Sequence, residues 1–188
     1  KEIKLFGPSG LDKMANSILM AYEEDINYRI YGTQPSNKKG YKYIFKSINE
    51  GLVFEDGNVK VEAFRVPHGS FDDAYGFKFT TEDKVIVFSG DTGPSKTIEK
   101  IAYKADILVH EVYSQAGFIK KTQDWQKYHQ GHHTSTIEVG EIASRAKPQL
   151  LLLSHILFWG STPDEILQET RQTFNGNIKV AEDLMIIE

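Results

Sequence analysis

Four segments of the chain have the hydrophobic pattern of buried strands, and each leads into a histidine or an acidic residue. They are residues 59–68, 84–91, 107–111 and 150–155, and they end on His68, Asp91, Glu111 and His155. Apolar and polar residues alternate in the first segment, whereas the other three contain short, continuous apolar runs, as expected for strands covered on both faces. Four strand ends of this kind predict one shared site rather than a coincidence of core packing.

The rest of the pattern predicts a mixture of helices and strands. Apolar residues at helical spacing predict helices over residues 11–23, 95–102, 135–146 and 162–174. Ser135 with Glu138 has the sequence of a capping box, and Thr162-Pro163 is typical of a helix start. Further strands are predicted over residues 3–6, 26–31, 74–80, 178–181 and 184–187, and residues 41–54 are ambiguous, with strands favoured near both ends.

Two segments are predicted to be loops. Residues 32–40 are polar and contain glycine and proline, and residues 112–130 are long, aromatic and glycine-containing, which favours a functional loop over a linker. Hairpins dominate the first half of the chain, and strands alternate with helices in the second. Without an internal repeat or a visible boundary, residues 1–188 are interpreted as one domain of the α/β (α+β) class, with a mixed sheet covered by helices.

Composition excludes several classes of protein. The 188 residues contain no cysteine, so neither a disulfide framework nor a thiolate metal site is available, and this absence favours the cytoplasm. No apolar run reaches the roughly 18–20 residues of a membrane span, so no membrane partner is expected. The formal net charge of −4 shows no overall basic field, and binding of nucleic acid would need a local basic patch.

His68, Asp91 and His155 are candidate metal ligands. An imidazole nitrogen and a carboxylate oxygen suit zinc, iron or manganese, and a carboxylate has two oxygens with which it can bridge two ions. One such residue alone is more often a structural residue in a turn, but three at equivalent strand ends favour a site. Glu111, beside them, is expected to orient an imidazole next to the metal and to stabilise its protonated form.

His132 and His133 precede the predicted helix at Ser135, where backbone N–H groups and the helix dipole favour an anion. An imidazolium there would help to bind a phosphate and could protonate a leaving oxygen, although a solvated loop explains these residues equally well. His129 is expected to be a plain surface residue. Three aromatic residues border the same region in sequence, and packing and substrate stacking are equally compatible with them: Trp125, Tyr128 and Trp159.

Together these motifs resemble the metallo-β-lactamase superfamily, and within it the ribonuclease Z-like branch of tRNA 3′-endonucleases and arylsulfatase-like proteins. The resemblance runs from Leu5-Phe6-Gly7-Pro8 to Ala181-Glu182-Asp183, and its short motifs are specific through their order and spacing. They are His68-Gly69 with Ala74-Tyr75-Gly76, Val87-Phe88-Ser89-Gly90-Asp91-Thr92, Leu108-Val109-His110-Glu111, His133-Thr134-Ser135-Thr136 and Leu153-Ser154-His155.

The resemblance implies an αββα sandwich, incomplete at the N-terminus in this chain, and a complete site with two Zn²⁺ ions, for which Mn²⁺ or Fe²⁺ are alternatives. By this match, His68 and His155 would be metal ligands and Asp91 would bridge the ions. Glu111 would pair with His133, and His133 would donate a proton to the leaving group. The implied activity is hydrolysis of a small ester or phosphodiester by metal-activated water.

The sequence departs from the family in one motif, His-x-His-x-Asp-His, which is absent from a chain with six histidines in all. Because the chain opens at Lys1 beside a predicted strand, a C-terminal portion of a longer hydrolase is the favoured interpretation. The alternative is a metal-poor, non-catalytic binding module. The long arm that clamps tRNA in tRNA-processing relatives is not evident, which, with the acidic balance, argues against tRNA as the substrate, whereas RNA in general stays open but is not supported by the charge. Sulfate esters and lactones are alternative substrates, and exposed sheet edges leave a homodimer open.

Overall fold

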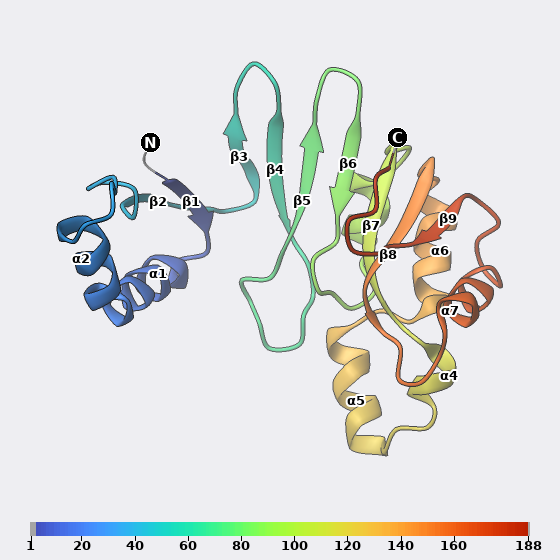
Figure 1. Cartoon of the computed structure of the whole chain (residues 1–188). Helices are drawn as coiled ribbons and strands as arrows, with labels where there is room; N and C mark the ends of the chain where they lie inside the picture. Colours follow the sequence, from blue (N-terminus) through green and yellow to red (C-terminus); the bar gives the residue numbers. More distant parts are fainter. Residues whose placement is uncertain (1–2, 188) are drawn as a thin grey trace. The chain divides into compact units, whose positions relative to one another are not determined.

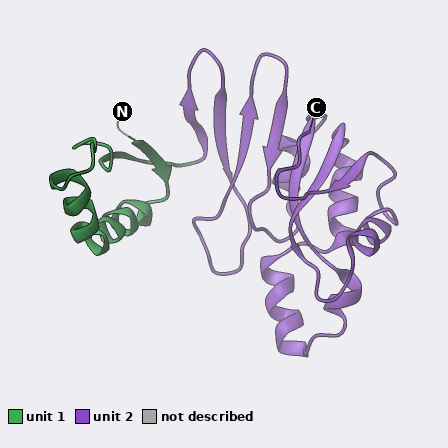
Figure 2. Ribbon diagram, in the orientation of Figure 1, with its two compact units in different colours: residues 1–49 green, residues 50–188 purple. Residues whose placement is uncertain are grey.

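The computed structural model describes residues 3–187, and the chain divides into two compact units, residues 1–49 and 50–188 (Figure 2). In the first unit, two parallel strands pair and two helices lie between them in sequence. The elements are β1 (Ile3–Gly7), α1 (Gly10–Ala21), α2 (Glu23–Tyr31) and β2 (Tyr43–Ser47). The strand and the helix predicted at the start of the chain, and the loop over residues 32–40, are confirmed.

The predicted strand over residues 26–31 is wrong, because this segment is the helix α2. Ile26 and Ile30 are partly buried, whereas Tyr28 between them is 78% exposed, so the apolar contact repeats every four residues rather than every two. An ion pair of 2.7 Å between Asp25 and Arg29 links successive turns, and acidic residues in the first turn complement the helix dipole. The prediction counted Tyr28 as a buried strand position, although its side chain is exposed on the helix.

In residues 50–187, seven strands form one sheet in the order β3-β4-β5-β6-β7-β8-β9 (Figure 1). The strands are β3 (Gly51–Glu55), β4 (Lys60–Arg65), β5 (Tyr75–Thr80), β6 (Val85–Phe88), β7 (Ile107–Tyr113), β8 (Leu150–Leu157) and β9 (Ile178–Val180). Neighbours from β3 to β6 are antiparallel, and neighbours from β6 to β9 are parallel. The predicted mixed sheet is thus confirmed, with hairpins first and strand–helix crossovers afterwards.

Five helices accompany this sheet in the described part of the second unit. They are α3 (Lys96–Ile101), α4 (Gln115–Phe118), α5 (Gln123–His132), α6 (Thr136–Ala146) and α7 (Pro163–Thr170). The predicted capping box of Ser135 and Glu138 is present at the start of α6, and Ser95 and Thr162 cap α3 and α7 as their sequences indicate. None of the helices in residues 3–187 is both long enough and apolar enough to cross a membrane.

One face of the sheet forms the main core with α3, α6 and α7. Leu108 and Val112 of β7 lie in this core beside Leu151 and Leu153 of β8, and all four are buried. Because successive strand residues point to opposite faces, the neighbour of Val112 in β7, Glu111, is directed to the other face. The alternation along β7 and β8 therefore separates the core of the molecule from its candidate site.

Two further predictions are wrong. Residues 112–130 do not form a long loop, because they contain the end of β7, the short helix α4 and most of α5. Ser114 caps α4 by accepting a hydrogen bond from the Gly117 amide. This helix-capping serine was overlooked because the loop was predicted from the aromatic and glycine content of the segment. Residues 184–187 are not a strand; Leu184 has φ of +65°, which is incompatible with an extended backbone. The predicted helix over 162–174 ends early, at Thr170.

Candidate active site

The candidate site lies at the carboxyl ends of the neighbouring parallel strands β6, β7 and β8. Asp91 follows β6, Glu111 lies near the end of β7, and His155 lies near the end of β8. Open α/β sheets bind ligands in the crevice outside the carboxyl ends of their strands. A pocket of about 230 Å³ adjoins these three residues and is bounded on its other side by aromatic side chains of β5 and β6: Tyr75, Phe77 and Phe88.

His155 is brought into the site by a β-bulge. Glu111 of β7 pairs with Ser154 of β8, and the next residue, Val112, pairs with Ile156. His155 is therefore an extra residue in β8 that has no partner in β7. Its φ is +43°, a left-handed conformation that is costly for a residue with a Cβ atom. The bulge re-aims the imidazole, and its Nδ1 lies 3.4 Å from Oδ1 of Asp91. The two side chains are 51% and 45% exposed, so they remain open to a ligand.

The turn that presents Asp91 requires a glycine. Gly90 has φ of +64°, and a Cβ atom at this position would approach the Tyr75 carbonyl oxygen to 2.5 Å. Ser89, one residue earlier, accepts a hydrogen bond of 3.1 Å from the Glu111 amide through its Oγ. The Ser-Gly-Asp sequence therefore joins the end of β6 to the end of β7 while it turns the aspartate toward the site.

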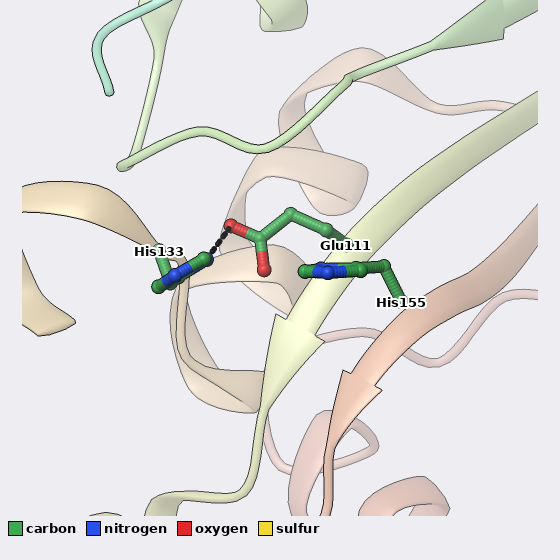
Figure 3. Close-up of side chains that lie close together, drawn as sticks. All are labelled: Glu111, His133 and His155. Carbon is green, nitrogen blue, oxygen red and sulfur yellow. Dashed lines mark ion pairs between the residues drawn. The ribbon is translucent and has the colours of Figure 1, made fainter. Parts of the chain in front are cut away.

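Glu111 is the buried centre of the site, with a side chain only 2% exposed. Its Oε1 accepts hydrogen bonds from the backbone amides of Thr92, at 3.2 Å, and Thr134, at 3.1 Å. The Thr134 hydroxyl in turn donates to the Thr92 carbonyl at 2.6 Å. Oε1 also lies 3.3 Å from Nδ1 of His133, as the dashed line in Figure 3 shows. One carboxylate thus fixes the loop after β6, the start of α6 and the His133 ring.

Burial and charge act in opposite directions on this pair. Burial raises the pKa of Glu111, and His133 and the two backbone amides only partly offset that rise. Burial by itself would lower the pKa of His133, but the Glu111 and Asp91 carboxylates outweigh it, so the pKa of His133 is raised above its usual value. The pair is therefore suited to hold an imidazolium beside a carboxylate.

His68 lies in the loop after β4 and contacts the same cluster. Its ring centroid is 5.3 Å from that of His133, and its Nδ1 lies 2.8 Å from the His132 carbonyl oxygen. Because a carbonyl oxygen only accepts, Nδ1 must be the donor, and in the neutral ring Nε2 then carries the lone pair. A backbone carbonyl that fixes the tautomer in this way is typical of a histidine prepared for metal binding.

All five residues predicted from the sequence lie in one cluster. Ligand-capable atoms of Glu111, His133 and His155 lie within 4.8 Å of one another (Figure 3), Asp91 contacts His155, and His68 contacts His133. The closest group differs from the predicted ligand set, because it contains Glu111 and His133 in place of His68 and Asp91. Oε1 of Glu111 already accepts two backbone amides, which favours an orienting role over that of a ligand. The individual roles stay predictions.

Sequence reasoning missed several contributors. Thr92 and Thr134 hold Glu111 through backbone amides, and His132 holds His68 through its carbonyl, so no side-chain type signals these roles. His129, predicted as a surface residue, is instead partly buried, and its ring lies 4.5 Å from that of Trp159. Burial lowers its pKa, helped by the nearby His133 and Lys121. The spacing of Trp125, His129 and His132 at i, i+4 and i+7 could have indicated that the three rings share one face of a helix.

Comparison with known proteins identifies the family and the fold of the chain. The family model described as β-lactamase superfamily domain matches residues 29–156. Ribonuclease Z of Mycobacterium tuberculosis (strain ATCC 25618 / H37Rv) is 26% identical over 192 residues, which cover 99% of this chain and 68% of that protein.

Two solved structures share the fold. The metallo-β-lactamase fold protein YhfI from Bacillus subtilis matches with a TM-score of 0.68 and 17% identity, over 100% of this chain and 65% of that one. The short form of human tRNase Z (ELAC1) matches with a TM-score of 0.61 and 20% identity, over 100% of this chain and 67% of that one. The chain thus spans about two thirds of the length of these proteins. By its family model, its relatives and its fold, the chain belongs to the metallo-β-lactamase superfamily and is ribonuclease Z-like.

Proposed function

We propose that this chain carries the proton donor and metal ligands of a metal-dependent hydrolase of phosphodiesters, with an activity like that of ribonuclease Z. One observation carries the proposal: the buried Glu111–His133 pair stands beside the open Asp91–His155 contact at the ends of adjacent parallel strands. If the Glu111–His133 pair had only a structural role, there would be no reason for the exposed imidazole of His155 and carboxylate of Asp91 to lie next to it. The ribonuclease Z relatives support the choice of a phosphodiester, and small esters remain within the same proposal.

The residues fit a divalent metal ion. Two imidazoles and a carboxylate form a donor set typical of zinc sites, and His68 already has the tautomer that leaves Nε2 as an acceptor. Glu111 Oε2 is buried without a hydrogen-bond partner among the described residues, so an acceptor also remains beside His133. His68, Asp91 and His155 would hold the metal in this proposal, with Asp91 shared if two ions bind. When bound, Zn²⁺, Mn²⁺ or Fe²⁺ supplies Lewis acidity and activates water as a nucleophile at neutral pH.

Residues of this chain would supply the proton that the leaving group needs. His133, whose pKa is raised by the Glu111 carboxylate beside it, would donate a proton to the leaving oxygen as the bond between phosphorus and that oxygen breaks. Glu111 would position the ring and would itself be held still by the Thr92 and Thr134 amides. A cytoplasmic location stays a prediction, and RNA as a substrate and a homodimer stay open alternatives within this proposal.

The proposal is tested by metal content and by hydrolysis of bis-p-nitrophenyl phosphate, both measured on the full-length protein. Replacing Asp91 by alanine should remove bound metal and activity together. His133→Ala should leave the metal content nearly intact and lower turnover by about 10²- to 10⁴-fold, the range of a general acid. Asp83→Ala provides a matched control, because Asp83 is an exposed carboxylate at the opposite end of β6.

A wild-type protein without bound metal and without activity would show that the chain is a binding module rather than an enzyme. Full activity in Asp91→Ala would overturn the role of Asp91 as a metal ligand and with it the proposed metal site. Loss of metal in His133→Ala would assign that residue to the metal and overturn its role as the acid. The Asp83→Ala variant should match the wild type in both measurements. If Asp83→Ala also loses metal or activity, the effect of Asp91→Ala reflects the loss of a negative charge rather than the loss of a metal ligand.

A further inference from the structure

Helix α5 carries a stripe of rings that leads directly to the candidate site. Trp125, Tyr128, His129 and His132 are spaced at i, i+3, i+4 and i+7, which places them on one helical face. The Tyr128 and His132 rings stack with centroids 4.1 Å apart, and the Trp125 and His129 rings lie nearly parallel at 5.6 Å. His132 ends the stripe 5.1 Å from the ring of the candidate ligand His68.

The stripe is open rather than part of the core. Among the described residues of α5 none is buried, and Trp125 and Tyr128 are 56% and 44% exposed. The helix extends away from the sheet, clear of α6 and α7 (Figure 1). Exposed rings gathered on one helical face in this way contribute little to folding, because burial is how rings normally stabilise a fold.

The charge around the stripe is the reverse of the charge of the chain. Residues 115–134 contain three lysines, Lys120, Lys121 and Lys127, against the single acid Asp124, whereas the whole chain has a formal net charge of −4. The Lys121 ammonium lies 4.7 Å from the centre of the Trp159 ring, which in turn packs against His129. A local positive field beside exposed rings is complementary to a polyanion that also carries flat, stackable groups.

We propose that the ring stripe of α5 is a subsite that stacks a base of single-stranded nucleic acid next to the scissile phosphodiester. Bases stack on aromatic side chains whatever their sequence, and lysines beside them attract the phosphates. Trp125 and Tyr128 provide the exposed faces, and His132 connects them to the cluster of His68 and His133. The inference rests on the proposed function for its substrate class, and it adds the surface on which that substrate is held.

Binding rather than turnover tests this subsite, so that its failure is distinct from failure of the hydrolase proposal. Affinity is measured by fluorescence anisotropy for a short oligothymidylate and for an abasic oligonucleotide of the same length. Trp125→Ala should weaken binding of the oligothymidylate by at least about fivefold, the lower end of what one stacked base contributes. Binding of the abasic strand should change little, and metal content should not change.

Tyr103→Ala is the matched control, because Tyr103 is a similarly exposed ring located before the start of β7, at the end opposite the site. It should bind both oligonucleotides as the wild type does, and Tyr128→Ala should repeat the effect of Trp125→Ala. Equal losses on the two oligonucleotides, unchanged affinity in both stripe variants, or no binding by the wild type would each overturn the subsite. A change in oligomeric state in Trp125→Ala without a change in binding would instead make the stripe a protein contact.

Discussion

His155 shows how a single residue can be held in an unfavourable conformation for the sake of the site. Its φ of +43° would suit glycine, yet the position carries an imidazole that contacts Asp91. The neighbouring β7 and β8 pairs on both sides of the bulge hold this backbone in place. We infer that the conformational cost is tolerated because only the bulge aims the ring away from the core and toward the carboxylate.

A pair of substitutions separates the backbone cost from the side chain. Both His155→Gly and His155→Ala remove the imidazole, but glycine adopts a positive φ without a clash between Cβ and the carbonyl oxygen. His155→Gly should therefore be about 1 kcal/mol more stable than His155→Ala, as measured by urea unfolding. Both variants should lose metal equally. Equal stabilities would show that the backbone at this bulge relaxes when the ring is absent.

Glu169 of α7 joins three elements through one carboxylate. Its oxygens accept hydrogen bonds from the Gln115 and Ala116 amides at the start of α4, at 2.8 and 2.9 Å. They also accept from the hydroxyls of Thr136, at 2.6 Å, and Ser114, at 3.3 Å. The carboxylate thus satisfies orphan amides at the start of α4 and anchors the start of α6, which ties both helices to α7.

Removal of this carboxylate should loosen the helices as a group. Glu169→Ala is expected to lower the free energy of unfolding by about 2–4 kcal/mol, since two backbone amides and two hydroxyls lose their acceptor. Gln168→Ala, an exposed neighbour on the same helix, should change it by less than about 0.5 kcal/mol. Chemical denaturation of the three proteins provides the comparison. A small effect of Glu169→Ala would mean that water replaces the carboxylate at these amides.

At the scale of the whole molecule, His110 couples the folded sheet to pH. Its ring is fully buried in β7, its Nδ1 donates to the Glu111 carbonyl at 2.7 Å, and burial lowers its pKa to about 4. An unfolded histidine has a pKa of about 6.5, so between these values the unfolded chain binds the additional proton. Stability from this residue is therefore present at neutral pH and is lost as the pH falls toward 4.

Acidification from pH 7 to pH 5 should cost the protein about 2 kcal/mol of unfolding free energy through His110 alone, in addition to the effects of other groups. His110→Asn retains an amide donor near the position of Nδ1 but does not titrate. The difference between wild type and variant, followed by denaturant unfolding at each pH, isolates the contribution. A loss of the same size in His110→Asn would assign the acid sensitivity to other residues.

The sequence predicted the strands that carry the site and the residues at their ends. Short apolar runs that end on polar side chains identify strands locally, so Asp91, Glu111 and His155 could be found without coordinates. The capping boxes of α6 and α7 were equally readable, because a cap involves residues only three positions apart. The apolar residues Ile26, Tyr28 and Ile30 fit both the two-residue repeat of a strand and the roughly four-residue repeat of a helix. The sequence pattern alone therefore predicted a strand where the chain forms a helix.

By itself, the sequence determined which side chains could carry chemistry, because residue type and strand ends are local properties. Only the tertiary structure decided which of them meet. Sheet order brings the ends of β6, β7 and β8 together, a bulge turns His155 toward Asp91, and the His132 carbonyl sets the tautomer of His68. The same holds for α5, whose rings form a site-adjacent stripe only because residues 112–130 fold into helices. Such contacts join residues that are distant in sequence through backbone groups, and backbone groups carry no sequence signal.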